Sequence, residues 1–196
     1  MIHTGLLLRS LGTILALSAG LNGLALFWPN PPLSFQATER GCYMGIRAKD
    51  LRECVIRPTL YKLDLYSLEA EELLLLTAAQ ESKLGYYLKQ VGGPALGIYQ
   101  IEPATHRDIL RYLYHKPELR DIIDSLATSA NDSELIWNLA YSTAIARVKY
   151  LMVPEAIPLT LEGQARYYKQ YYNTPLGRAT EDEAIKNYIN YVTNGA

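Results

Sequence analysis

From Met44 onward, apolar residues recur along the chain at the spacing of helices, and no stretch alternates in a way that persuasively predicts a strand. The clearest segment is Leu68–Ala79, which is apolar on most faces after its first acidic residues. A helix with this pattern is usually buried in a core. Ser67 stands just before it, and a serine oxygen can accept a hydrogen bond from the free N–H groups of a first turn. The pattern predicts a buried helix that ends near Glu81.

The same spacing predicts further helices in the rest of the chain. They cover residues 49–55 (with Pro58 bending or restarting the helix), 103–114, 117–127, 133–153 and 162–172. Asn131 and Asp132 are N-cap candidates for the helix over 133–153, and Thr180 with Glu183 forms a capping box for a last helix. Residues 85–97 are rich in Gly and Pro, which predicts a loop or short hairpin. The expected fold class is all-α, with at most a minimal β-hairpin.

The first 43 residues differ from the remainder and predict a hydrophobic extension with a linker, followed by a domain over residues 44–196. The stretch from Leu11 to Trp28 has no charge over 18 residues, barely enough to span a bilayer, and Arg9 precedes it. Three interpretations stay open: an uncleaved signal anchor, a cleaved signal peptide, or a segment outside the functional domain with Met44 as the true start. We expect a transient membrane contact, if any, through residues 5–28.

Composition and motifs narrow the function further. The 196 residues carry a net charge of −1, which argues against nucleic acid as a partner because phosphate binding needs a basic footprint. Sixteen Tyr stand beside two Phe; they suit sugar contacts in a wet groove, or are ordinary half-buried helix residues. His106 and His115 lack an acidic partner at metal-binding spacing, so no metal site is expected. No phosphate-loop or dinucleotide-binding motif appears, and we expect no cofactor.

The position of Glu81 is the first indication of chemistry. It follows an apolar helix and precedes the Gly-rich loop, where desolvation raises the pKa of a carboxyl group. A raised carboxyl pKa is what a general acid needs to protonate a glycosidic oxygen near neutral pH. The alternative is that Glu81 is an ordinary solvated or capping residue at a helix end.

A set of short motifs favours the catalytic interpretation. It consists of Glu81-Ser82, then Gly97-Ile98-Tyr99-Gln100-Ile101, then Pro103-Ala104-Thr105. The set resembles the soluble lytic transglycosylase family, whose members have a lysozyme-like (goose-type) fold, and it covers about 25 residues of the chain. Residues 44–175 are also similar to small proteins of tailed bacteriophages.

The resemblance implies that Glu81 is the single catalytic acid/base and that Ser82 and Gln100 shape the sugar site. Gln100 can both donate and accept hydrogen bonds, as a sugar amide or hydroxyl requires. Gly97 would let the backbone approach a sugar closely. Either Tyr99 or the later Tyr172 is expected on a wall of the same cleft, with Glu81 at its floor.

The pair Tyr172-Asn173 and the residue Glu102 extend the expected site. The family often has an Ala-Tyr-Asn-Ala-Gly segment whose Tyr and Asn line the cleft. Here the Tyr172-Asn173 pair is present and is followed by Thr174-Pro175 instead of Ala-Gly. Glu102 stands where the family usually has an apolar residue. It is either the second carboxylate of an inverting hydrolase or the N-cap of the helix that Pro103 begins.

The function expected from these residues is cleavage of the MurNAc–GlcNAc β-1,4 backbone of peptidoglycan, by lytic transglycosylation or by muramidase hydrolysis. The alternatives are a non-catalytic phage virion or adaptor protein with a lysozyme-like fold, and a chitinase- or chitosanase-like glycosidase. The expected partners are peptidoglycan glycan strands and, in the phage setting, virion proteins. The expected location is the bacterial cell envelope or periplasm, or the phage virion.

Overall fold

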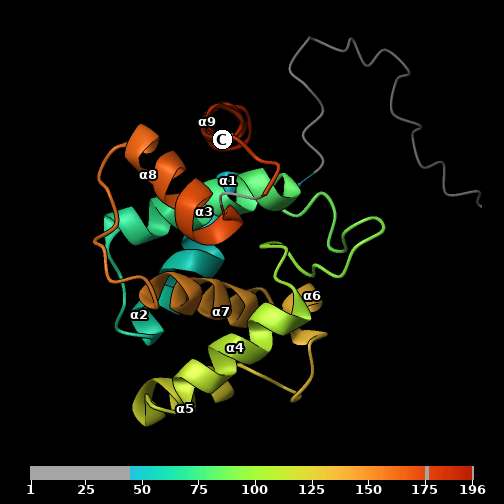
Figure 1. The fold of residues 1–196 in the computed structure, drawn as a ribbon, viewed down its shortest axis with the longest axis vertical. Coiled ribbons are helices and arrows are strands. Elements are labelled where there is room, and N and C mark those ends of the chain that lie inside the picture. Colours follow the sequence, from blue (N-terminus) through green and yellow to red (C-terminus); the bar gives the residue numbers. More distant parts are fainter. Residues whose placement is uncertain (1–44, 175–176, 196) are drawn as a thin grey trace, which may run out of the picture. The chain divides into compact units, whose positions relative to one another are not determined.

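Helices make up most of the computed structural model, which describes residues 45–174 and 177–195 (Figure 1). The all-α prediction is confirmed. The described residues belong to one unit, residues 41–196. The hydrophobic extension over residues 1–43, including the stretch 5–28, lies outside the described residues. In the part of the chain that is described, no helix is long and apolar enough to cross a bilayer.

The first helical run contains a π-helical section. It consists of α1 (Ala48–Asp50), the π-helical η1 (Leu51–Ile56) and α2 (Arg57–Lys62), and the backbone stays in the right-handed helical region across both junctions. Pro58 lies in the first turn of α2. Because proline has no N–H to donate, Pro58 interrupts the bonding pattern of the helical run directly after the π-helical section. The change from η1 to α2 agrees with the predicted restart at Pro58.

The predicted buried helix is α3 (Leu68–Ser82), which packs against α7, α8 and α9. Its residues Leu73, Leu74, Leu75 and Leu76 are fully buried. The Ser67 hydroxyl accepts a hydrogen bond of 3.1 Å from the Ala70 N–H, which confirms the predicted N-cap. Because the helix is apolar on most faces, it lies inside the fold and brings its last turn, with Glu81, to the edge of the core.

The single helix predicted over 133–153 is wrong. The structure contains α6 (Glu134–Trp137) and α7 (Leu139–Leu151), separated at Asn138, whose backbone is extended. The Asn138 side chain accepts from the Tyr141 N–H at 3.0 Å and so caps α7. Asparagine side chains compete in this way with continuous helical bonding, and the apolar spacing on either side did not reveal it.

The prediction that Asn131 or Asp132 is the N-cap of this helix is also wrong, because both side chains bond other groups. Ser133 is the residue that precedes α6, and its side chain makes no capping bond. Asn131 accepts a hydrogen bond from the Ser133 N–H at 2.8 Å. Asp132 instead bonds the His106 ring, with 2.7 Å between its Oδ1 and Nδ1. These side chains close the turn before α6 and fasten it to α4.

The remaining elements lie close to their predicted positions. They are α4 (Pro103–Leu113), α5 (Pro117–Asp124), α8 (Leu161–Tyr167), the π-helical η2 (Tyr168–Asn173), α9 (Glu181–Tyr188) and the π-helical η3 (Ile189–Thr193). Prolines begin α4 and α5, as predicted. The capping box of Thr180 and Glu183 at the start of α9 is confirmed.

The loop between α3 and α4 contains isolated antiparallel bridges, Lys89 to Leu96 and Leu96 to Ile101, where a short hairpin was one of the predictions. Its tightest contact is at Gly97, which has a φ of +76°. A Cβ atom placed there would lie 1.8 Å from the Leu135 carbonyl oxygen. Because Gly97 has no side chain, this loop can pack directly against the backbone of α6.

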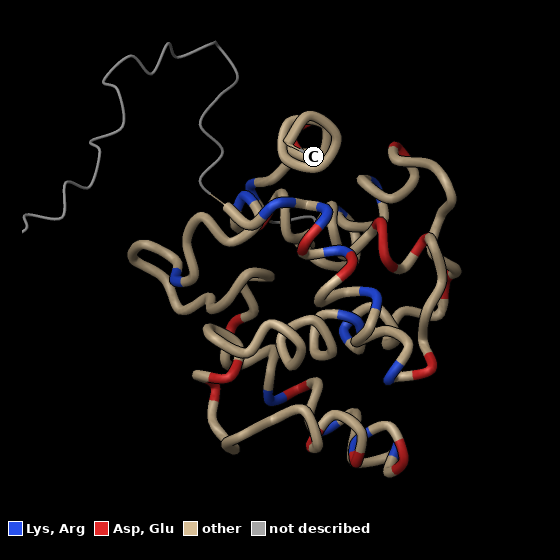
Figure 2. The backbone as a smooth tube through the Cα atoms, turned by 180° about the vertical axis from the view of Figure 1, so that it is seen from behind, with Lys and Arg blue, Asp and Glu red and all other residues tan. Residues whose placement is uncertain are grey.

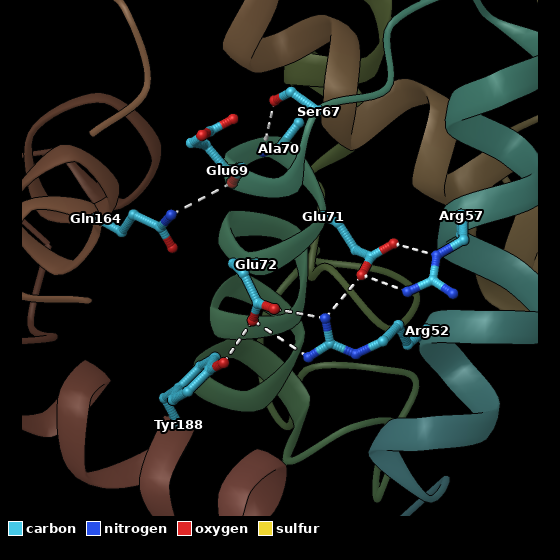
Figure 3. Close-up of polar contacts among 9 residues, drawn as sticks. All are labelled: Arg52, Arg57, Ser67, Glu69, Ala70, Glu71, Glu72, Gln164 and Tyr188. Atoms are coloured by element: carbon cyan, nitrogen blue, oxygen red, sulfur yellow. Dashed lines mark hydrogen bonds and ion pairs between the residues drawn. The ribbon is translucent and has the colours of Figure 1, made fainter. Parts of the chain in front are cut away.

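Charged residues of both signs are spread over the described chain, so neither sign is confined to one part of it (Figure 2). Among the residues that the structure describes, the most buried ion pairs are those of Glu71 in α3, whose side chain is fully buried (Figure 3). Its carboxylate accepts from Arg52 at 2.7 Å and from Arg57 at 2.8 Å. Glu72 bonds Arg52 as well, and Tyr188 of α9 donates to Glu72. The network ties α3 to the first helical run and to α9.

The first prediction concerns domain independence. Every described element lies after Met44, and the core is formed among those elements. A chain that begins at Met44 is expected to be soluble, helical by circular dichroism and cooperative in thermal unfolding. The full chain is the comparison. A truncated protein that aggregates, or melts without cooperativity, would show that the first 43 residues are needed to complete the fold.

Candidate active site

A cleft of about 870 Å³ lies where the end of α3 meets the loop after it, the start of α4, α7 and η2. Five residues that the sequence singled out line this one cleft: Glu81, Gln100, Glu102, Tyr172 and Asn173. They come from segments up to 92 residues apart in the chain, Glu81 and Asn173 being the outermost. The tertiary structure therefore brings an acid, an amide and an aromatic residue to a common groove.

Glu81 is partly buried in the last turn of α3. Its Oε1 accepts a hydrogen bond of 2.6 Å from the Tyr168 hydroxyl. Burial raises the pKa of Glu81 to about 7, while the Tyr168 hydrogen bond and the charge of Lys149 act in the opposite direction. The shift has the direction that the apolar helix predicts. A carboxyl group with this pKa is present in both protonation states near neutral pH, as an acid/base catalyst requires.

Two residues next to Glu81 were missed from the sequence, Tyr168 and Lys149. Tyr168 is almost fully buried, and burial, reinforced by the charge of Glu81, raises the pKa of its hydroxyl, which remains a donor. The Lys149 ammonium donates to the Tyr172 carbonyl at 3.0 Å and lies 3.5 Å from the centre of the Tyr172 ring. Burial lowers the pKa of Lys149 to about 8. The sequence feature that could have identified Lys149 is the presence of a cationic residue in the largely apolar helix α7.

The π-helical turn η2 places several groups on the cleft. Tyr168 and Tyr172 lie four residues apart with stacked rings, 5.8 Å between centroids, and both line the cleft together with Asn173. The Tyr172 hydroxyl donates to the Tyr99 carbonyl at 2.8 Å. Short π-helical sections often occur at functional sites, because they shift side chains relative to a regular α-helix. The Tyr pattern of this segment did not reveal the change of helix type.

Gln100 and Glu102 face the cleft from the loop before α4. Gln100 has a φ of +46°, and its side-chain amide donates to the Gly97 carbonyl at 2.7 Å. A non-glycine residue in this region of the backbone map is strained, and such strain is often found at binding sites. Glu102 is exposed and occupies the N-cap position of α4 without making a capping bond. Glu102 is therefore the N-cap residue of α4 by position, as one of the two interpretations predicted, and its role as a second carboxylate stays a prediction.

Three predicted substrate contacts are corrected by the structure. Ser82 is fully buried, and its hydroxyl donates to the Ile98 carbonyl at 2.7 Å. Tyr99 is fully buried as well, with its hydroxyl 3.1 Å from that of Thr143. Gly97 is buried against Leu135 rather than open to a sugar. These three motif residues therefore hold the loop to the core, and the cleft is lined by Gln100 and Thr105 of the later motifs together with Glu81.

His106, considered above as a metal ligand, has both ring nitrogens in hydrogen bonds. Nδ1 lies 2.7 Å from Asp132, and Nε2 lies 2.8 Å from the Tyr141 hydroxyl. Within residues 45–174 and 177–195, no group of three or more His, Cys, Asp or Glu side chains is placed to hold a metal ion. The buried His106 ring thus links α4 to α7 through its hydrogen bond with Tyr141.

Comparison of the chain with protein-family models, with curated proteins and with solved structures found no match. The described part of the chain has an all-α fold with a cleft that brings together the carboxyl group of Glu81, the hydroxyl of Tyr168 and the ammonium group of Lys149. This set of groups can transfer a proton to and from a bound oxygen atom, and the amides beside it can orient a polar ligand.

Proposed function

We propose that the protein is a peptidoglycan-cleaving glycosidase that cuts the MurNAc–GlcNAc β-1,4 backbone with Glu81 as its single acid/base. The observation that carries the proposal is the position of Glu81 in the wall of a cleft of about 870 Å³, where Tyr168 donates a hydrogen bond to it and burial raises its pKa to about 7. The resemblance of the Glu81-Ser82 and Gly97–Thr105 motifs to lytic transglycosylases, and with them to a lysozyme-like fold, supports the same activity.

The chemistry begins with protonated Glu81. It donates its proton to the glycosidic oxygen while the bond from that oxygen to the MurNAc C1 breaks, and positive charge develops on the sugar ring. The resulting Glu81 carboxylate then accepts a proton from the incoming nucleophile. In transglycosylation the nucleophile is the C6 hydroxyl of the same MurNAc, which forms the 1,6-anhydro ring; in hydrolysis it is water.

Burial favours the protonated form of Glu81, and two neighbouring residues favour the carboxylate that remains after proton transfer. The hydrogen bond from Tyr168 favours the carboxylate, as does the positive charge of Lys149. Gln100, with its amide near the same cleft, is suited to orient an N-acetyl group. Glu102 is the residue that would activate a water molecule in an inverting hydrolase, whereas transglycosylation needs no second carboxylate.

Mass spectrometry of purified peptidoglycan after digestion tests the proposal. Anhydro-muramyl ends identify a lytic transglycosylase, and reducing ends identify a muramidase. Intact glycan after prolonged incubation would contradict the proposal and would favour a non-catalytic virion or adaptor protein. Digestion of chitin or chitosan, with peptidoglycan left intact, would show that the enzyme is a glycosidase for another polymer.

The pH dependence is a second prediction. Because the reaction needs protonated Glu81, kcat/KM is expected to fall as the pH rises through about 7. Tyr168→Phe removes a donor that stabilises the carboxylate, so it raises the pKa of Glu81 and moves this fall to higher pH. Initial rates measured from pH 5 to about 9 give both curves.

Tyr167→Phe is the matched control for this prediction. The Tyr167 hydroxyl donates to the Glu155 carbonyl at 2.9 Å, and Tyr167 does not line the cleft. Its loss is expected to leave the pH at which kcat/KM falls unchanged. A shift to lower pH in Tyr168→Phe, or equal shifts in both variants, would contradict the assignment of that fall to Glu81.

The proposed activity also sets where the protein acts, in the bacterial envelope or as part of a phage virion. Peptidoglycan glycan strands are its proposed partners, with virion proteins in the second setting.

A further inference from the structure

A second cavity, of about 440 Å³, adjoins the cleft that contains Glu81. The two share three lining residues, Gln80, Arg178 and Ala179. The second cavity, which we call the side branch, is completed by Glu183, Lys186 and Asn187 of α9. Helices α3 and α9 pack against each other (Figure 1), and residues of both helices line the branch. A ligand held in the cleft can therefore extend a substituent into the branch.

The side branch has two cationic side chains that form no ion pair with another described residue. These residues, Arg178 and Lys186, are both exposed. The one acid of the branch, Glu183, uses its carboxylate to accept from the Thr180 N–H at 2.9 Å in the capping box. The negative charge of Glu183 is therefore engaged by the backbone at the start of α9. The branch is best suited to an anionic group.

The junction between cleft and branch is polar. The Asn187 amide donates to the Gln80 side-chain oxygen at 2.9 Å, which links α9 to the turn of α3 that also carries Glu81. Side-chain amides offer both donors and acceptors, as the backbone of a bound peptide requires. An arginine head group in addition binds carboxylates through two parallel hydrogen bonds.

We propose that the side branch binds the carboxylate-bearing stem peptide of the MurNAc unit held in the cleft. This inference rests on the proposed function. The β-1,4 glycan backbone itself is uncharged, and the carboxylates of intact peptidoglycan are carried by the peptides attached to its lactyl groups. Arg178 and Lys186 make the enzyme selective for peptide-substituted glycan, and they do so through substrate binding rather than through the chemistry at Glu81.

The test compares two substrates and a double variant, Arg178→Ala with Lys186→Ala. The substrates are peptidoglycan with its peptides and the same glycan after an amidase has removed them and the lactyl carboxylates that this hydrolysis frees have been capped as methyl amides. The wild type is expected to cleave the peptide-bearing glycan with the higher kcat/KM. The double variant is expected to lose about tenfold in kcat/KM on that substrate, the equivalent of one well-placed ionic contact, and to keep its rate on the stripped glycan.

The matched control removes the same two charges elsewhere. Lys62 and Arg166 are exposed, lie on α2 and α8, and line neither cavity. Their double alanine variant is expected to match the wild type on both substrates. An equal loss in this control would mean that overall charge, and not the side branch, attracts the anionic polymer.

Calorimetry with the free stem peptide gives a readout that needs no cleavage. Binding is expected to weaken about tenfold in the Arg178/Lys186 variant and to remain in Glu81→Gln. Equal losses on both glycans, or unchanged peptide binding, would overturn the side-branch inference while leaving the glycosidase proposal intact. Peptide binding by a wild-type protein that cleaves neither glycan would overturn the glycosidase proposal and retain the branch as a peptide site.

Discussion

Glu81→Gln should lower glycan cleavage by roughly 10²–10⁴-fold, because the variant keeps the shape of the side chain and loses the proton that general acid catalysis transfers. The fold is expected to persist, since the glutamine oxygen can still accept the Tyr168 hydrogen bond. Release of soluble fragments from purified sacculi measures the loss. The matched control is Glu53→Gln, the same change at an exposed residue of η1, which should keep full activity.

The same variant should also be more stable than the wild type above neutral pH. In the unfolded chain a glutamate loses its proton near pH 4.5, whereas in the folded protein Glu81 holds it to about 7. Between these values the folded state binds more protons, so the wild type loses stability as the pH rises, and the loss is complete above about 7. Glutamine has no such dependence. The expected gain at pH 8 is on the order of 2 kcal/mol, with little difference at pH 4.

Urea unfolding of both proteins at pH 4 and pH 8 separates the two effects. A variant that loses activity and gains stability only at high pH has lost a buried titrating carboxyl group. Equal stability of the two proteins at pH 8 would show that Glu81 is better solvated than its position indicates. Retention of most activity on sacculi would remove Glu81 from the catalytic role.

Gly97→Ala is expected to destabilise the fold by about 3–5 kcal/mol. A side chain at this φ of +76° costs about 1–2 kcal/mol, and its Cβ atom would meet the Leu135 carbonyl oxygen at 1.8 Å, so backbone on one side must move. Gly92→Ala is the matched control. Gly92 has a similar φ of +71° with no atom within 4 Å of its added Cβ, so only the backbone cost of about 1–2 kcal/mol applies.

Denaturant unfolding at pH 5 measures both losses. Equal losses for the two glycine variants would mean that the loop before α4 does not press against α6 as tightly as the structure has it. If the Gly97 variant remains folded, its activity is expected to fall as well, because Gln100 donates to the Gly97 carbonyl and moves with it.

Much of the helical framework was predictable because its causes are local. Apolar spacing, the serine before α3, the prolines that begin α4 and α5, and the capping box of α9 all act within a few residues. The prediction failed where one side chain acts against the surrounding pattern. Asn138 turns its amide oxygen back to the Tyr141 N–H and divides an otherwise continuous helical sequence.

The candidate site shows the same division between local and long-range causes. By itself, the sequence determined that a glutamate follows a buried apolar helix and precedes a glycine-rich loop, and that was enough to predict a raised pKa at Glu81. Only the tertiary structure decided that Tyr168 and Lys149 surround this carboxyl group and that Ser82 and Tyr99 turn into the core. Desolvation follows from the chain neighbours of a residue, whereas hydrogen bonds and charges across 60 to 90 residues depend on how the helices pack.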